Sequence, residues 1–160
     1  EKLSVDTAKS VGFVFGDLPE GGSPIQKVVI NWPAATYSAQ WSTEESRWLL
    51  SHNNKLNLAD SGVVLGPTTL VIQMVEISPS EYGDKFGGVT PLSKTVGSGR
   101  AYILRDGQVF ATTWNRAFPD SGTTFNLPDG AAMNFAPGQV WVALTDREPE
   151  LTSRSTAKTK

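Results

Sequence analysis

The chain has no cysteine and only one histidine. Without cysteine it can form no disulfide and no thiolate metal site, and it has no acylation site of its own. His52 is the only histidine that a Ser-His-Asp triad could use, and no Gly-x-Ser-x-Gly sequence accompanies it. We therefore expect His52 to be an exposed loop residue. We also expect no catalytic residue, no metal site and no cofactor.

The chain also lacks an excess of either charge and any long apolar run. Its 14 basic and 16 acidic residues give a formal net charge of −2, which argues against a dedicated nucleic-acid-binding protein. No run approaches the ~18 apolar residues that span a membrane. We therefore expect no membrane-spanning segment in this sequence.

The clearest feature that is present is a β-hairpin from Gly97 to Arg116. Asp106-Gly107 is the preferred sequence of a two-residue type I′ turn, because both residues tolerate positive φ. Counting back from this turn places Gly99 opposite Trp114, and Gly97 opposite Arg116. Large residues on one strand thus face small ones on the other.

This register allows two interpretations of the open end of the hairpin. In the first, the glycines make room for Trp114 and for the stem of Arg116. In the second, Gly97-Ser98-Gly99 lets a ligand approach the backbone and Arg116 supplies a fixed charge. The candidate ligand-binding residues are therefore Gly97, Ser98, Gly99, Trp114 and Arg116. Packing explains Gly99 but leaves Arg116 unexplained.

Short strands at regular spacing, with few helical periods, predict an all-β or mainly β fold. A small antiparallel barrel and a two-layer sandwich, each with long loops, both fit. The run 69–77 predicts a buried central strand. Residues 78–95 are expected to form a long glycine-rich loop. We divide the chain into an interdomain linker and first strand (1–16), a β-rich domain (17–146) and a disordered tail (147–160).

Five tryptophans are many for 160 residues: Trp32, Trp41, Trp48, Trp114 and Trp141. Their places in strands favour the core for most of them. If two or more line one open groove, a carbohydrate or peptide site is indicated.

Several segments together resemble the C-terminal domain of YerB-like bacterial lipoproteins, a domain of unknown function. The segments are 97–109, 113–116, 124–125, 129–130 and 137–142, with 41–51 and 70–73 fitting the same pattern. The likeness extends over about 15–144, and the composition is similar to that of actinobacterial members.

The resemblance implies an extracytoplasmic protein that is held to the membrane by lipid, with an N-terminal domain before this one. It transfers no catalytic residue. The first hypothesis is a non-catalytic cell-envelope module that binds an envelope protein, a peptide or a glycan. The alternative is a hydrolase or other enzyme acting on a cell-wall polymer through Glu76 or Asp106 with Arg116. A third possibility is a spacer that supports the N-terminal domain, with all five tryptophans buried.

Overall fold

The computed structural model describes residues 10–85 and 87–154, and within them it contains strands and turns but no helix. The expected all-β fold is therefore confirmed. The strands are β1 Val14–Phe15, β2 Ser23–Trp32, β3 Ala35–Ser42, β4 Arg47–His52, β5 Lys55–Leu56, β6 Thr69–Met74, β7 Ile77–Gly83, β8 Val89–Ser93, β9 Gly97–Arg105, β10 Gln108–Arg116, β11 Thr124–Asn126, β12 Asn134–Phe135, β13 Val140–Thr145 and β14 Glu150–Ser153.

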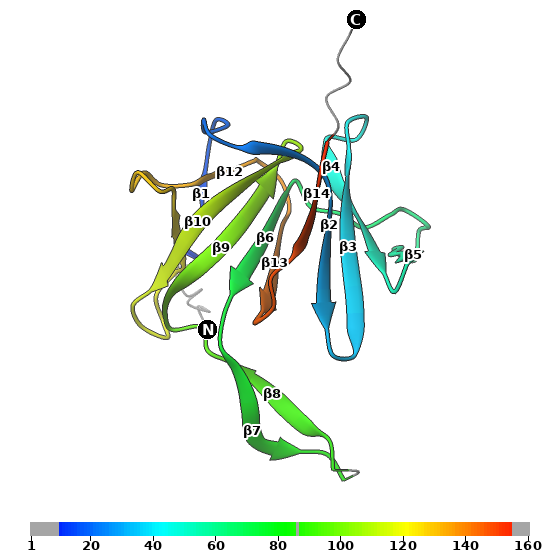
Figure 1. Ribbon diagram of the computed structural model, residues 1–160, viewed down its shortest axis with the longest axis vertical. Helices are drawn as coiled ribbons and strands as arrows, with labels where there is room; N and C mark the ends of the chain where they lie inside the picture. Colours follow the sequence, from blue (N-terminus) through cyan, green and yellow to red (C-terminus); the bar gives the residue numbers. More distant parts are fainter. Residues whose placement is uncertain (1–9, 86, 155–160) are drawn as a thin grey trace, which may run out of the picture.

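Most of these strands belong to one ten-stranded sheet. Its order is β13-β6-β9-β10-β2-β3-β4-β5, while β11 also pairs with β10, and β14 with β2. Strands β10 and β2 pair only at Gln108–Pro24 and Val109–Ser23, and the sheet turns a corner there. Its two halves consequently face each other as an open half-barrel (Figure 1). The fold lies between the two architectures that the sequence suggested.

The half formed by β13, β6, β9 and β10 carries a core on each face, and both faces are fully buried at β6. Its inner face packs against β2, β3 and β4 in a core that includes Val28, Leu50 and Leu104. Its outer face carries a second core, which includes Trp114 and is covered by the segments around β1, β11 and β12. Two-sided burial explains the apolar residues 70–72 of β6, where residues 69–73 are all buried.

The hairpin of β9 and β10 has the predicted register throughout. Arg105 lies opposite Gln108, Gly99 opposite Trp114, and Gly97 opposite Arg116. At the turn, φ is +50° for Asp106 and +68° for Gly107, as a type I′ turn requires.

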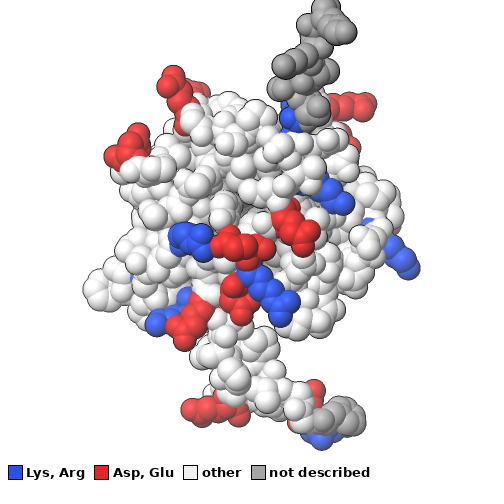
Figure 2. All heavy atoms as spheres, in the orientation of Figure 1, with Lys and Arg blue, Asp and Glu red and all other residues white. Residues whose placement is uncertain are grey.

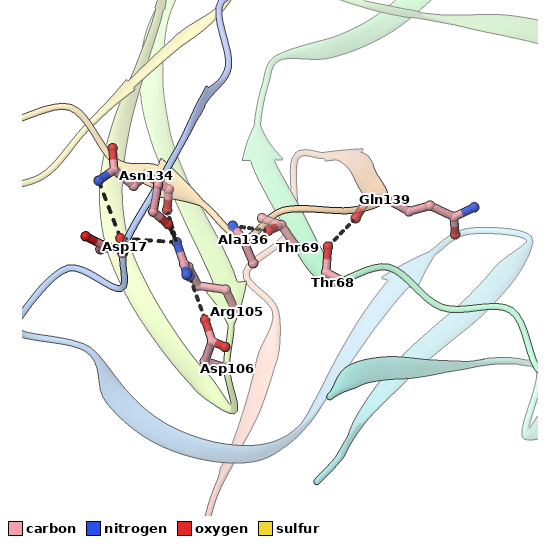
Figure 3. Close-up of polar contacts among 9 residues, drawn as sticks. Asp17, Thr68, Thr69, Arg105, Asp106, Asn134, Ala136 and Gln139 are labelled. Carbon is pink, nitrogen blue, oxygen red and sulfur yellow. Dashed lines mark hydrogen bonds and ion pairs between the residues drawn. The ribbon is translucent and has the colours of Figure 1, made fainter. Parts of the chain in front are cut away.

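Arg105 ties the N-terminal segment to this hairpin (Figure 3). Its side chain is only 5% exposed, and its Nε donates to Asp106 Oδ2 at 2.7 Å. Its Nη1 donates to the carbonyl oxygens of Gly16 at 3.0 Å and Asn134 at 2.9 Å. One buried cation thus satisfies backbone groups on both sides of the β1–β12 pair.

Two threonines at the start of β6 position the chain that leads into β13 (Figure 3). Thr69 Oγ1 accepts a hydrogen bond from the Ala136 amide at 2.9 Å, and Thr68 Oγ1 donates to the Gln139 carbonyl at 3.0 Å. Strand β13 then pairs in parallel with β6. Within the described chain, β13 pairs with no second strand.

The loop expected at 78–95 is instead largely a hairpin of β7 and β8, which projects from the body of the molecule (Figure 1). The turn is closed by Asp84, whose Oδ1 accepts from the Gly88 amide at 2.9 Å. Gly87 has φ of +87° there. Both strands are mostly exposed, so they carry no apolar alternation from which strands could have been predicted.

The prediction of disorder from Arg147 onward is wrong for 150–153. These residues form β14, which pairs antiparallel with β2, with Leu151 opposite Val28. The tail is polar, but it completes the backbone hydrogen bonding of one edge of β2, and this gain does not depend on apolar side chains. Residues 155–160 and 1–9 lie outside the described chain, including most of the expected linker.

Candidate binding site

Trp114 and Gly99, two of the predicted site residues, pack against each other. Trp114 is 3% exposed and lies over Gly99, and its Nε1 donates to the Met74 carbonyl at 2.8 Å. A Cβ built on Gly99 would lie 2.7 Å from Trp114 Nε1. Trp114 is thus a core residue, and Gly99 provides the space for its indole.

The other predicted site residues are divided between two cavities. Gly97 and Ser98 line a cavity of about 200 Å³ with the edge of Trp114. Glu76 and Lys94 lie in the same cavity and form an exposed ion pair at 3.5 Å. Arg116 lines a different cavity, so the five residues do not form one site.

Arg116 is held at the open end of the hairpin by the turn that follows β10. One Nη atom donates to the Pro119 carbonyl. Its Nε is buried and has no hydrogen-bond partner among the described residues. Leaving a buried donor unpaired costs about 1–3 kcal/mol. Arg116 therefore remains the predicted site residue that packing does not explain.

A separate groove lies between β13 and the facing half of the sheet. It has a volume of about 190 Å³, and Trp32 and Tyr37 line one side while Trp141 lines the other. The Trp32 and Tyr37 rings meet edge to face at 5.8 Å, and Tyr37 stacks on His52 at 4.6 Å. The groove thus presents three aromatic side chains along one opening.

The free edge of β13 borders this groove. The Gln139 and Thr145 carbonyls accept hydrogen bonds on the β6 side of β13. Because carbonyl directions alternate along a strand, the carbonyls of the even-numbered residues between them point away from β6. On that open side, Trp32 Nε1 donates to the Leu144 carbonyl at 2.9 Å. Val142 lies at the same edge and is 45% exposed. Unpaired backbone and aromatic surface therefore lie together.

The tryptophans divide into two groups. Trp48 and Trp114 are buried in the two cores, whereas Trp32, Trp41 and Trp141 are only partly buried. The mark expected of a pure spacer, burial of all five, is therefore not observed. Two of the partly buried ones, Trp32 and Trp141, line the aromatic groove.

Sequence reasoning missed Gln73, Tyr37 and the free edge of β13. Gln73 is 3% exposed, and its Nε2 has no partner among the described residues. A signal was present, because Gln73 is the polar residue inside the apolar run of β6. The aromatic groove joins strands that lie far apart in the sequence, so no local pattern marks it.

Charges on the visible face are intermixed rather than gathered by sign (Figure 2). In the described part of the chain, no three His, Cys, Asp or Glu side chains cluster as a metal site would require. His52 is exposed, as expected. No helix that is long and apolar enough to cross a membrane occurs within 10–85 and 87–154.

Over the residues that the structure describes, the half-barrel with its open strand edge defines an all-β domain. The model of the DUF3048 C-terminal domain, a protein family of unknown function, matches residues 28–142. The chain belongs to this family. No curated protein matches the sequence.

The fold is also similar to the crystal structure of YerB protein from Bacillus subtilis. The TM-score is 0.66 at 13% sequence identity, and the match covers 86% of this chain. It covers 46% of the YerB chain, so the present chain spans about half the length of that relative. At this identity the likeness establishes the fold, and the predicted relation to YerB is confirmed.

Proposed function

We propose that this chain is a non-catalytic binding module of a cell-envelope lipoprotein, and that its aromatic groove takes an extended peptide or glycan. The observation that carries the proposal is the position of Trp32, Tyr37 and Trp141 around one opening beside the unpaired edge of β13. Aromatic faces stack on sugars and pack on peptide side chains. An open strand edge offers backbone donors and acceptors to an extended chain.

The proposal includes an extracytoplasmic location, with a lipid anchor and an N-terminal domain outside this chain, which the resemblance to YerB-like lipoproteins implies. In that setting the partners within reach are envelope proteins, peptides and wall glycans. The absence of a one-sign charged patch on the visible face fits such partners better than nucleic acid.

The enzymatic alternative gains no support from the acids that the sequence suggested. Asp106 lies at the closed end of the hairpin and Arg116 at its open end, so they cannot act on one bond. Glu76 is on the same end as Arg116, but it lines the other cavity and pairs with Lys94. We therefore keep the binding module as the proposed function.

Sedimentation with insoluble peptidoglycan tests the proposal. Two substrates separate the ligand classes: intact peptidoglycan, and glycan strands from which the peptides have been removed by an amidase and which are coupled to beads so that they sediment. Wild-type protein should sediment with at least one of them. Trp141→Ala should weaken binding about tenfold or more, since a central aromatic side chain carries much of the binding energy.

Trp41→Ala is the matched control, because Trp41 is also partly buried but lies outside the groove. Both variants are first shown to be folded by circular dichroism. Binding to both substrates identifies the glycan, and binding to intact peptidoglycan alone identifies the peptide. Failure of the wild type to sediment with either, or equal losses in the two variants, contradicts the proposal.

A further inference from the structure

The aromatic groove is bordered by backbone of β13 that pairs with no second strand within the described chain. The parallel pairing with β6 uses the odd-numbered residues of β13, since the Gln139 and Thr145 carbonyls accept hydrogen bonds from that side. The N–H and C=O groups of Val140 and Val142 therefore point out from the free edge. A free strand edge of this kind is a template on which a further strand can pair.

One end of this edge is closed by a side chain from the facing half of the sheet. Trp32 Nε1 donates to the Leu144 carbonyl at 2.9 Å, so this carbonyl is already paired. Across the groove from β13, Trp32 of β2 and Tyr37 of β3 form the opposite wall. Because this wall faces the edge, the space beside Val142 suits a single extended segment better than the edge of a second sheet.

The lining of the groove distinguishes a peptide from a glycan. None of the described residues that line it is charged, and only Tyr37 and Ser38 contribute side-chain hydroxyl groups. A sugar would bury several hydroxyl groups against these apolar walls with few partners, which is unfavourable. A peptide pairs its polar backbone with the strand edge and needs only an uncharged, apolar side chain to fill the groove.

We infer that an extended peptide binds as an added strand on β13, with its backbone paired to Val142 and an apolar side chain in the groove beside Trp141. Trp141 and Ala143 lie on the groove face of β13, so side chains at alternate positions of the peptide reach that face. The inference rests on the proposed function in taking this groove as the binding site, and it narrows the ligand to a peptide.

Amide hydrogen exchange in the presence of acetyl-Thr-Leu-Thr-Leu-Thr-amide tests the backbone pairing. The leucines of this probe lie on one face of an extended chain. At saturation, exchange of the Val142 amide should slow about tenfold or more, because this N–H gains a hydrogen-bond partner. The Ala143 amide is the internal control, since it faces β6. Unchanged exchange at Val142, or equal slowing at both amides, overturns the inference.

Two N-methylated forms of the probe test the same pairing from the side of the ligand. One is methylated at the central threonine and the other at both leucines. A paired strand directs alternate residues toward its neighbour, so one form should bind at least about tenfold more weakly than the other. Weakening by the threonine methyl group identifies antiparallel pairing, and weakening by the leucine methyl groups identifies parallel pairing. Equal affinities of the two forms contradict strand addition.

Val142→Pro removes the N–H group that points out from the edge. Proline is compatible with an edge strand at such a position. Val142→Ala is the matched control, because it shortens the side chain and keeps the N–H group. With both variants shown to be folded by circular dichroism, Val142→Pro should bind the probe about tenfold more weakly than Val142→Ala. Equal binding by the two variants is the contrary result. If Val142→Pro does not fold, exchange of the wild-type Val142 amide decides.

Three outcomes separate this inference from the proposed function. Binding of the probe in the groove, without sedimentation on either wall substrate, supports the inference and contradicts the proposed function. Binding to peptide-free glycan strands that Val142→Pro leaves unchanged supports the proposed function and overturns the inference. Self-association in light scattering that Val142→Pro abolishes assigns the edge to a second copy of the chain, which also overturns the inference.

Discussion

Trp114 lies directly over Gly99, and a Cβ on Gly99 would come within 2.7 Å of the indole nitrogen and 3.1 Å of the Met74 carbonyl. Gly99→Ala should therefore displace the indole and weaken its hydrogen bond to Met74. We expect a loss of about 1–3 kcal/mol in the free energy of unfolding. Urea unfolding followed by tryptophan fluorescence measures it.

Ser98→Ala is the control for this change, because Ser98 is the exposed neighbour on the same strand. Its unfolding midpoint should stay close to that of the wild type. Equal midpoints for Gly99→Ala and Ser98→Ala would show that Trp114 does not need the space above Gly99.

Arg105→Met should destabilise the attachment of the N-terminal segment. The substitution leaves the Gly16 and Asn134 carbonyls without their donor in a buried site. We expect a loss of about 3 kcal/mol in the free energy of unfolding. Hydrogen exchange should also become faster at the Gly16 amide, which donates to the Phe135 carbonyl.

Asp106→Asn removes the ion pair with Arg105 and leaves the turn conformation in place. Asparagine tolerates the positive φ of position 106, and Arg105 keeps its hydrogen bonds to the Gly16, Asp17 and Asn134 carbonyls. We expect less than about 1 kcal/mol of destabilisation. If Asp106→Asn lowers the free energy of unfolding as much as Arg105→Met does, Arg105 stabilises the protein through its ion pair with Asp106. The attachment of the N-terminal segment would then not explain the loss.

Tyr102 and Glu148 form a hydrogen bond whose strength depends on pH. Tyr102 Oη donates to Glu148 Oε2 at 2.7 Å. This bond is the main cause that lowers the pKa of Glu148 and raises the pKa of Tyr102. The stabilisation from Glu148 is complete above its ordinary pKa of 4.5 and is lost as the pH falls through the lower folded value.

The stabilisation from Tyr102 depends on pH in the opposite direction. Its stabilisation is complete below the ordinary pKa of 10.0 and is lost as the pH rises through the higher folded value. Tyr102→Phe should therefore cost under about 1 kcal/mol at pH 7, given the exposure of Glu148. The difference from the wild type should shrink at pH 3, as unfolding midpoints would show. A difference that is the same at pH 3 and pH 7 would contradict this coupling.

Deletion of β14 should weaken the sheet at β2. Ending the chain after Pro149 exposes backbone groups of β2 that pair with 150–153. Free strand edges favour association, so we expect a lower unfolding temperature and a larger species in light scattering. A chain that ends after Arg154 keeps β14 and serves as the control. Identical behaviour of the two truncated chains would show that β14 contributes nothing to stability.

The parts of the fold that could be derived from the sequence are those fixed by local chemistry. Asp106-Gly107 sets the hairpin register, and the β6 run indicates burial on both faces. Strand β14 and the β7–β8 hairpin could not be derived, since they form through backbone pairing without apolar alternation. Arg116 was found because packing left it unexplained, but Gln73, which lines the same cavity, comes from a strand that is not adjacent.

The sequence predicted an aromatic groove only on the condition that two or more tryptophans share one opening. The number of tryptophans raised the possibility of a site, but which of them share an opening depends on how the sheet curls. Trp32 and Trp141 come together because β13 pairs with β6 and its free edge faces β2 and β3. No pattern within either strand encodes that approach.

The most direct test of the proposed function is the response of the tryptophan indole N–H signals in NMR to soluble peptidoglycan fragments. Trp32 and Trp141 line the groove, whereas Trp48 and Trp114 are buried in the two cores. On titration, the signals of Trp141 and Trp32 should shift with a common dissociation constant, and those of Trp48 and Trp114 should stay in place. Unchanged Trp32 and Trp141 signals at saturating fragment would contradict the proposed binding site.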